Sequence, residues 1–472
     1  MAVFGALALL SAVLAGCSVS QALGFSEEPN VVLIVADDMR ADDLEYMPET
    51  KALIGEEGVT FENAFVTDPL CCPSRATMLR GQYTHNHGVE GNVPPRGGLQ
   101  RFRELGREES TVATWLDSED YSTAYFGKYM NGYRGTHVPP GWDEWYAVSG
   151  NYESDRYNNN GRIERHDPEQ VYETDLLSDK ATGYLRSALE EESPVFAYLS
   201  PRAPHAPANP AARHEDELPD VSLPRPPSFD EEDVSDKPAW VRERPRLEAG
   251  EVEAMEELYR KRLQSLLSVD EMVARLVDTL RQSGELENTY IAFTSDHGHH
   301  FGEHRLPAGK WTAYEEDIGV PLVVRGPGVP EGETREHLVL NTDLAPTFAD
   351  LAGASMQTSV DGRSLSPLLG DDPPRTSGWR TAFMVEAGPF FAGAWAGEPL
   401  DRPRLEAVRT EDRLYVEYAT GERELYDLRE DPYQLENRHE EADPGLLRRM
   451  EERLDALRGC AGEECRSAED GR

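Results

Sequence analysis

Lysine and cysteine are scarce in this chain of 472 residues, and acidic side chains far outnumber basic ones. The chain has six lysines and five cysteines. Its 88 aspartates and glutamates exceed its 47 lysines and arginines, and the formal net charge is −41. Nucleic acid repels such a polyanion at long range, which excludes general nucleic-acid binding. The cysteines have no zinc-type spacing. An acidic surface also requires that any anionic ligand be held by a local basic pocket.

Only one long apolar run is present, Met1–Gly16, and it is too short for a comfortable transmembrane helix. The run leads into Cys17 and resembles a bacterial lipoprotein signal, although it lacks a lysine or arginine near its start. We therefore predict a signal segment over residues 1–24 and an exported, extracellular or periplasmic protein. Lipidation of Cys17 would anchor it to a membrane. A plain secretory signal and a buried helix are the alternatives.

The body of the chain alternates between strand-like and helix-like segments. Continuous apolar runs predict strands buried on both faces of a sheet, namely Val31–Ala36, Val195–Leu199 and Tyr290–Thr294. Amphipathic periodicity predicts helices, namely Thr111–Asp117, Tyr172–Glu191 and Leu258–Gln282. This alternation indicates an α/β fold with a large mixed, mainly parallel sheet flanked by helices. Residues 206–250, crowded with proline and charge, are predicted as a long surface excursion beside the site entrance.

The C-terminal part has a different pattern. Short strands and then a helix are predicted at Ala382–Val385, Leu405–Arg409, Arg413–Tyr418 and Leu446–Leu457. We therefore divide the chain into a large domain over residues 25–375, a smaller α+β subdomain over 376–458 and a tail over 459–472. Cys460 and Cys465 could form a small-loop disulfide in an exported protein, the alternative being two idle thiols.

Acidic residues follow two of the predicted strands. Asp37 and Asp38 come directly after the first, and Asp296 and His297 come just after the third. The carboxyl ends of parallel strands form the ligand crevice of open α/β sheets, and adjacent carboxylates repel each other unless a cation lies between them. These four residues predict a divalent-metal site. Oxygen ligands suit Ca²⁺, whereas the nitrogen of His297 leaves Mn²⁺ open. A solvated turn is the alternative for the first pair.

The segment Cys71-Cys72-Pro73-Ser74-Arg75 precedes a short helix-like run, Ala76–Leu79, that stops at Gly81. Proline is favoured in the first helical turn and glycine just past the last. Cys71 is therefore predicted at a helix N-terminus, where free N–H groups and the helix dipole favour an anion.

Retained lysines and clustered histidines mark further candidates. Where arginine has replaced most lysines, Lys128 and Lys310 are candidates for a compact ammonium that a guanidinium cannot imitate. Four of the twelve histidines fall within residues 297–304, a clustering that favours a site. His205 lies between prolines that would fix its loop.

With these motifs in place, the chain resembles a sulfatase of the alkaline phosphatase superfamily over nearly all of residues 28–440, closest to the N-acetylglucosamine-6-sulfatase-like branch. The resemblance rests on Cys-x-Pro-x-Arg at residues 71–75 together with blocks such as NVVLIVADDMR, YFGKYMNGY, APHAP, TSDHGHHFGEHRL and ELYDLREDPYQLEN. Each block is weak alone, but together they are highly specific. The implied fold is alkaline phosphatase-like, with residues 25–375 as the catalytic domain.

The resemblance implies a role for each matching residue. Cys71, oxidised to formylglycine (3-oxoalanine), would be the nucleophile. The ion, Ca²⁺ in first place and Mn²⁺ or Mg²⁺ as alternatives, would be held by Asp37, Asp38, Cys71, Asp296 and His297. Arg75 would steady the formylglycine hydrate, and the sulfate oxygens would contact Lys128, His205 and Lys310. His205 or Lys310 could protonate the leaving alcohol. Many sulfatases have a histidine where this chain has Met130, and the following Asn131 is assigned to the hydroxyl side.

The implied function is a sulfuric ester hydrolase acting on a sulfated saccharide or a small sulfate ester. Its partner would be a formylglycine-generating enzyme that oxidises Cys71. Two alternatives remain open. One is a phosphonate monoester or phosphodiester hydrolase on the same scaffold. The other is a surface lipoprotein that binds sulfated glycans without cleaving them because Cys71 stays a thiol.

Overall fold

The computed structural model describes residues 28–191, 193–389 and 402–471. The predicted signal segment, with Cys17, lies outside these residues. Within the described part of the chain, no helix combines the length and the apolar character needed to cross a bilayer.

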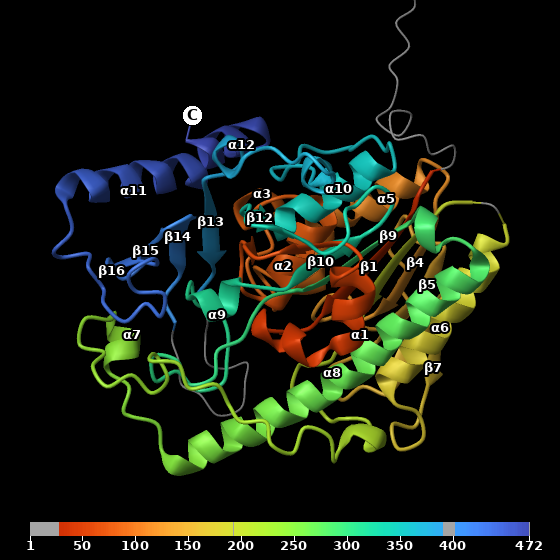
Figure 1. The fold of residues 1–472 in the computed structure, drawn as a ribbon, viewed down its shortest axis with the longest axis horizontal. Coiled ribbons are helices and arrows are strands. Elements are labelled where there is room, and N and C mark those ends of the chain that lie inside the picture. The colour runs from red at the N-terminus through yellow and green to blue at the C-terminus, as the bar shows by residue number, and fades with distance from the viewer. Residues whose placement is uncertain (1–27, 192, 390–401, 472) are drawn as a thin grey trace, which may run out of the picture.

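A ten-stranded sheet runs through the molecule (Figure 1). The central strands β9, β1, β8, β4 and β5 are parallel, whereas β10, β6 and β7 pair antiparallel to their inner neighbours. The sheet thus confirms the predicted mixed, mainly parallel α/β architecture. In spatial order the strands are β11 Glu333–Arg335, β2 Val59–Phe61, β10 Leu322–Arg325, β9 Thr289–Ser295, β1 Asn30–Ala36, β8 Val195–Ser200, β4 Ser122–Gly127, β5 Glu144–Val148, β6 Arg156–Asn159 and β7 Arg162–Arg165.

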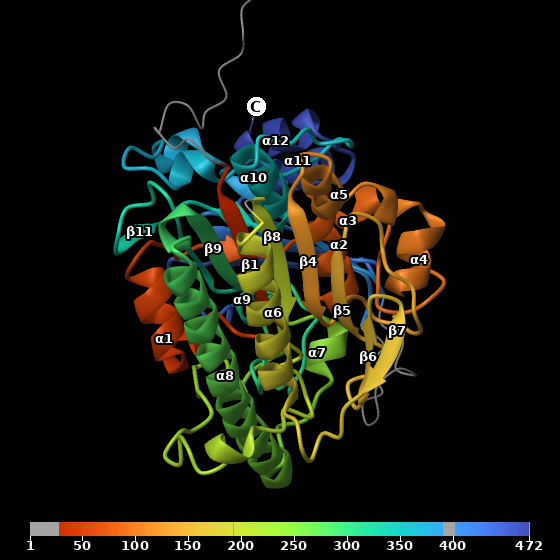
Figure 2. The same ribbon diagram turned by 90° about the vertical axis from the view of Figure 1, so that its right-hand side faces the viewer.

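Helices cover both faces of the sheet, so its central strands are buried along almost their whole length. Figure 2 shows α6 (Glu173–Leu189) and α8 (Ala249–Ser283) lying across one face. The other face packs against α2 (Cys71–Arg80), α5 (Val112–Asp117) and α10 (Leu344–Leu351). Alternate residues of β1 enter the two cores, Val32 and Ile34 on the α6–α8 side and Val31 and Leu33 on the other. All seven residues of β1 are buried, as the continuous apolar run predicts.

The C-terminal subdomain is a four-stranded antiparallel sheet beside the large one, covered by α11 (Pro444–Arg458) (Figure 1). Its strands are β13 Ala382–Ala387, β14 Leu405–Thr410, β15 Arg413–Tyr418 and β16 Arg423–Asp427. The first three match the prediction, and β16 adds to it. The remaining α-helices and strands of the described residues are α1 Pro48–Thr50, α3 Thr84–His87, α4 Gly98–Glu104, α7 Ala239–Arg242, α9 Glu315–Ile318, α12 Glu463–Asp470, β3 Ala64–Phe65 and β12 Val339–Leu340.

The excursion over residues 206–250 is not a purely surface segment. Lys237 is fully buried, and its ammonium donates to the backbone carbonyls of Gln434 and Leu435 at 2.8 and 2.7 Å. The excursion is therefore docked on the C-terminal subdomain. In addition, α8 begins at Ala249, earlier than the predicted start at Leu258.

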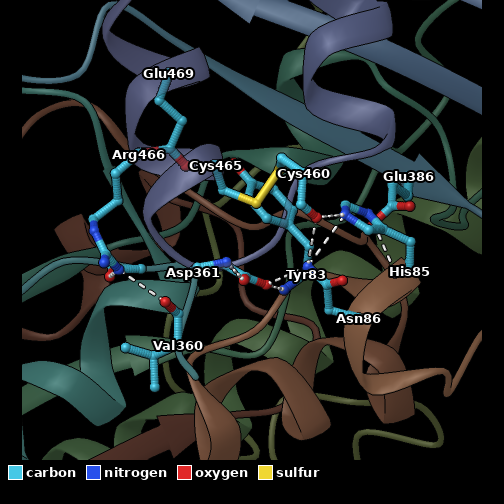
Figure 3. The surroundings of a disulfide bond; sticks show 12 residues. Tyr83, His85, Asn86, Val360, Asp361, Glu386, Cys460, Cys465, Arg466 and Glu469 are labelled. Atoms are coloured by element: carbon cyan, nitrogen blue, oxygen red, sulfur yellow. Dashed lines mark hydrogen bonds and ion pairs between the residues drawn. A yellow bond between two sulfur atoms is a disulfide. The ribbon is translucent and has the colours of Figure 1, made fainter. Parts of the chain in front are cut away.

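The segment predicted as a tail, residues 459–472, is folded where the structure describes it. The predicted disulfide between Cys460 and Cys465 is present and precedes α12 (Figure 3). The carbonyl oxygen of Cys460 accepts hydrogen bonds from His85 and Asn86, at 3.1 and 3.0 Å. These contacts fasten the end of the chain to α3.

The carboxylate of Glu469 on α12 anchors the same segment. It is fully buried, pairs with Arg380 at 2.7 Å and accepts a hydrogen bond from the Tyr83 hydroxyl at 2.6 Å. Glu469→Gln is therefore expected to lower the free energy of unfolding by about 1–3 kcal/mol, because charge-assisted bonds are lost in a dry site. Denaturant unfolding measures this. Glu463→Gln, on the exposed side of α12, is the matched control, and equal stabilities of the two variants would contradict the prediction.

Candidate active site

Two strand ends bring four of the predicted ligands together. Asp37 and Asp38 follow β1, Asp296 and His297 follow β9, and the two strands pair in parallel register. The backbone of Asp38 is left-handed, with φ of 69°, a costly conformation that aspartate tolerates better than most residues. Its N–H donates to Oδ1 of Asp296 at 2.9 Å. Each of the four residues is at most 1% exposed.

Cys71 is the first residue of α2, as predicted, and the helix ends at Gly81 with φ of 65°. Its Sγ lies 3.1 Å from Nζ of Lys310 and 3.4 Å from Nε2 of His297. Burial alone would raise the pKa of Cys71, but the ammonium groups of Lys128 and Lys310, with His297, hold it at about 5. Position 71 therefore favours a negatively charged side-chain atom.

The ligand atoms of four buried residues converge closely enough to hold one metal ion. In the described chain, one ligand atom each of Asp38, Cys71, Asp296 and His297 lies within 4.8 Å of the others. Nδ1 of His297 donates to the carbonyl of Gly298 at 2.9 Å, so Nε2 faces the cluster. Two carboxylates and an imidazole fit a divalent cation that prefers oxygen ligands but accepts one nitrogen.

Asp37, the remaining predicted ligand, faces Lys128, whose ammonium donates to both carboxylate oxygens at 2.6 and 2.7 Å. Burial raises the pKa of Asp37 well above its usual range, and the nearby carboxylates of Asp296 and Asp38 add to the rise against the attraction of Lys128. Such crowding of buried carboxylates is relieved by added positive charge, which is a second argument for a cation here.

Arg75 joins the strand ends around the cluster. Its guanidinium pairs with Asp296 at 2.8 Å and donates to the carbonyl of Lys128 at 2.9 Å and to Oγ of Ser200 at 2.6 Å. This fork geometry is one that lysine cannot reproduce. Arg75 thus holds the ends of β4, β8 and β9 against α2. Its predicted contact with a formylglycine hydrate stays a prediction.

Lys310 and His205 approach different carboxylate oxygens of Asp38. Nζ of Lys310 donates to Oδ1 of Asp38 at 2.7 Å, and Nε2 of His205 lies 3.5 Å from Oδ2. Burial lowers the pKa of His205, and its Nδ1–H donates to the carbonyl of Ala206 at 2.6 Å. A neutral ring with its proton on Nδ1 offers only a lone pair at Nε2. Of the two predicted proton donors, this arrangement favours Lys310.

Other predicted residues lie farther from Cys71 or contact different groups. The amide oxygen of Asn131 lies 3.5 Å from Sγ of Cys72, so Asn131 borders the cluster beside the second cysteine. Two residues of the histidine-rich segment contact carboxylates outside the metal cluster. His300 contacts Asp317 at 2.8 Å, and His304 contacts Glu231 at 2.6 Å. These two histidines therefore support the surrounding loops.

Sequence reasoning missed two residues at the cluster. The Tyr152 hydroxyl lies 2.5 Å from Nζ of Lys128 and 4.0 Å from Sγ of Cys71. No sequence signal marks Tyr152, which lies in a loop. Arg262 of α8 is 1% exposed and donates to the carbonyl of Asp38. An arginine on the apolar face of a predicted amphipathic helix was a signal that could have found it.

The arrangement suits chemistry on an anionic group. Two lysines and an arginine supply positive charge in a largely buried site, where electrostatic attraction is stronger than in solution. The side chain at position 71 stands in that field at the N-terminus of α2. A nucleophile carried there would meet an anion held by the lysines.

Comparison with known proteins agrees with this geometry. A family model described as Sulfatase matches residues 29–354, and one described as N-sulphoglucosamine sulphohydrolase, C-terminal, matches residues 302–459. The N-acetylglucosamine-6-sulfatase of Homo sapiens is 35% identical over 98% of this chain and 90% of its own. The arylsulfatase of Volvox carteri is 36% identical over 96% of this chain and 78% of its own.

Solved structures share the fold. A protein in complex with its substrate D-Glucosamine-2-N, 6-O-disulfate has a TM-score of 0.79 at 23% identity, covering 94% of this chain and 100% of that one. The phosphonate monoester hydrolase of Agrobacterium radiobacter has a TM-score of 0.71 at 24% identity, covering 91% and 95%. At such identities the likeness shows the fold alone. The family model, however, spans most of the chain, and the curated relatives match it nearly end to end, so this chain belongs to the sulfatase family.

Proposed function

We propose that the chain removes sulfate from a sulfated glucosamine, using a formylglycine made from Cys71 and one divalent cation. Sulfate ester hydrolysis itself follows from membership of the sulfatase family. The observation that carries the proposal is the position of Cys71, 3.1 Å from Lys310 and 3.4 Å from His297 at the start of α2. The relative named N-acetylglucosamine-6-sulfatase and the neighbour bound to a glucosamine disulfate support the choice of sugar.

The chain's own residues account for binding and proton transfer. Lys128 and Lys310 hold the negative sulfo group in front of position 71, and His205 can donate to it through Nε2 only when its ring is protonated. Lys310 gives a proton to the departing alcohol. Arg75 fixes Asp296, and through it the end of β9. The cation would be held by Asp37, Asp38, Asp296, His297 and the modified side chain of Cys71, and it would supply Lewis-acid stabilisation of charge on the oxygens. Formylglycine supplies a hydrated aldehyde oxygen as nucleophile.

The phosphonate alternative has less support, because the neighbour of that activity is similar in fold alone. The experiment is a comparison of turnover on D-glucosamine 6-O-sulfate, 4-nitrophenyl sulfate and bis(4-nitrophenyl) phosphate, with enzyme of verified aldehyde content. Sulfate release from the sugar should dominate. Preferred cleavage of the phosphodiester would overturn the proposal. A Cys71 peptide that keeps the mass of the thiol would favour the glycan-binding alternative.

We also propose that the protein is exported and anchored through a lipid on Cys17. The disulfide near the C-terminus suits an oxidising compartment. A relative from Drosophila melanogaster, 36% identical over 76% of this chain, is named an extracellular sulfatase. Metabolic labelling with a fatty acid, compared between the parent and Cys17→Ser, tests the anchor.

Removal of the metal ion is expected to lower kcat by at least about a hundredfold, because the crowded carboxylates lose their counter-charge and the sulfo group loses its Lewis acid. Exhaustive chelation followed by an activity assay measures this, and elemental analysis verifies removal. Ca²⁺ should restore activity better than Mn²⁺ or Mg²⁺. Full activity in metal-free enzyme would contradict the prediction.

A further inference from the structure

Tyr152 occupies a position that the roles assigned so far do not explain. Its ring lies flat on the imidazole of His205, with centroids 3.6 Å apart and planes 8° from parallel. Its hydroxyl oxygen lies 2.5 Å from Nζ of Lys128 and 4.0 Å from Sγ of Cys71. One side chain thus contacts two residues assigned to sulfate binding and faces the position of the nucleophile.

The hydrogen-bonding capacity of these groups fixes the direction of the contact. The ammonium of Lys128 has no lone pair, so it must donate, and the hydroxyl oxygen of Tyr152 must accept. The hydroxyl hydrogen is then left to be donated to another group. A sulfo group within reach of Lys128, Lys310 and position 71 has to lie in this same space. Its oxygens are the acceptors that would match the remaining donor.

Arg202 fixes the loop that carries Tyr152. Its guanidinium donates to the carbonyl oxygens of Asn151, Tyr152 and Ser154, at 3.0, 2.6 and 3.2 Å, and pairs with Glu173 at the start of α6. Arg202 also lies three residues before His205 in the chain. The two rings are therefore brought together through a single arginine.

A cavity of about 370 Å³ opens on the same two rings. Besides Tyr152 and His205 it is lined by residues that include Tyr157, Tyr172 and Arg202. Its volume is within the range of small-molecule sites. The cavity therefore borders the Tyr152–His205 pair, whereas Cys71, Lys128 and Lys310 are not among the residues that line it.

We propose that Tyr152 is a further substrate-binding residue, whose hydroxyl donates a hydrogen bond to the sulfo group, and that Arg202 is the positioning residue of its loop. This inference rests on the proposed function, since it assigns a contact within the same site.

Tyr152→Phe isolates the hydroxyl, because the phenyl ring still covers His205. Loss of one hydrogen bond to a charged group should lower kcat/KM for the sulfated sugar by about 10- to 100-fold. The affinity for inorganic sulfate, measured by calorimetry, should fall by a similar factor. Tyr290→Phe is the matched control: its hydroxyl also donates to a backbone carbonyl, that of Pro327 at 2.8 Å, but near the start of β9, away from the strand end that Asp296 follows. It should leave both quantities unchanged.

Arg202→Gln should reproduce much of the Tyr152→Phe loss, and the double variant should be little worse than either single one, because both act through the same hydroxyl. Additive losses would reject the positioning role. Sulfate affinity and kcat/KM of Tyr152→Phe within twofold of the parent would overturn the binding role. An increase would also overturn it, since Tyr152 would then obstruct the site. If parent enzyme with verified aldehyde releases no sulfate from any ester, the proposed function fails instead.

Discussion

Replacing Cys71 by alanine is expected to abolish desulfation, with kcat/KM at least about a thousandfold below that of the parent. Alanine lacks the Sγ atom, which lies 3.1 Å from Nζ of Lys310 and 3.4 Å from Nε2 of His297. The lysines remain and can still bind sulfate, but they have no nucleophile to assist. The loss should therefore appear mainly in kcat, with KM changed far less.

Cys72→Ala is the matched control, because the two thiols are neighbours with opposite surroundings. Burial, with the charge of Cys71, raises the pKa of Cys72 to about 12, and its sulfur accepts a hydrogen bond from the backbone of Asn131 at 3.0 Å. Cys72→Ala should convert position 71 to the aldehyde, seen as a lower peptide mass, and should keep most of the activity. Desulfation by metal-loaded Cys71→Ala at the parental rate would refute the nucleophile assignment.

The central fold was predictable because its strands are buried on both faces. A continuous apolar run such as Val31–Ala36 has few alternatives to a central strand, and it forms most of β1. The last two strands at one end of the sheet, β6 and β7, were missed because their sequences, RYNN and RIER, are polar and gain their order from pairing with neighbours. The helix α12 was missed because tertiary contacts hold it, such as those of the buried Glu469 carboxylate, and local sequence does not show them.

The site was predictable where a reactive side chain comes next to the end of a strand or at the start of a helix. Asp38 and Asp296 each come next to a strand end, and Cys71 begins a helix, so local sequence places all three. Tyr152 contacts Cys71 across 81 residues of chain and lies in a loop without periodicity. Neither its sequence neighbours nor its residue type indicates that contact. The same holds for Arg202, whose partners are backbone carbonyls rather than a motif.

Lys310→Met is expected to lower kcat/KM for a sulfated sugar by about 100- to 1,000-fold, because a fixed ammonium next to the developing charge is removed. Burial alone would lower the pKa of Lys310, but Asp38 and Cys71 hold it above its usual range. These contacts favour the ammonium form, which can act as donor. Methionine keeps the length and apolar stem, so packing is disturbed little. Steady-state kinetics with enzyme of equal aldehyde content measure the loss, and Lys261→Met, an exposed lysine of α8, is the matched control.

The size of the Lys310→Met loss on different esters separates the two tasks assigned to this residue. A sugar alcohol leaves poorly without a proton, whereas 4-nitrophenolate leaves readily as an anion. If Lys310 donates that proton, the loss should be much larger for D-glucosamine 6-O-sulfate than for 4-nitrophenyl sulfate. Equal losses on the two esters would restrict Lys310 to binding the sulfo group and return the proton transfer to His205. A loss below threefold on both would remove Lys310 from the reaction, although its ammonium lies 2.7 Å from Asp38.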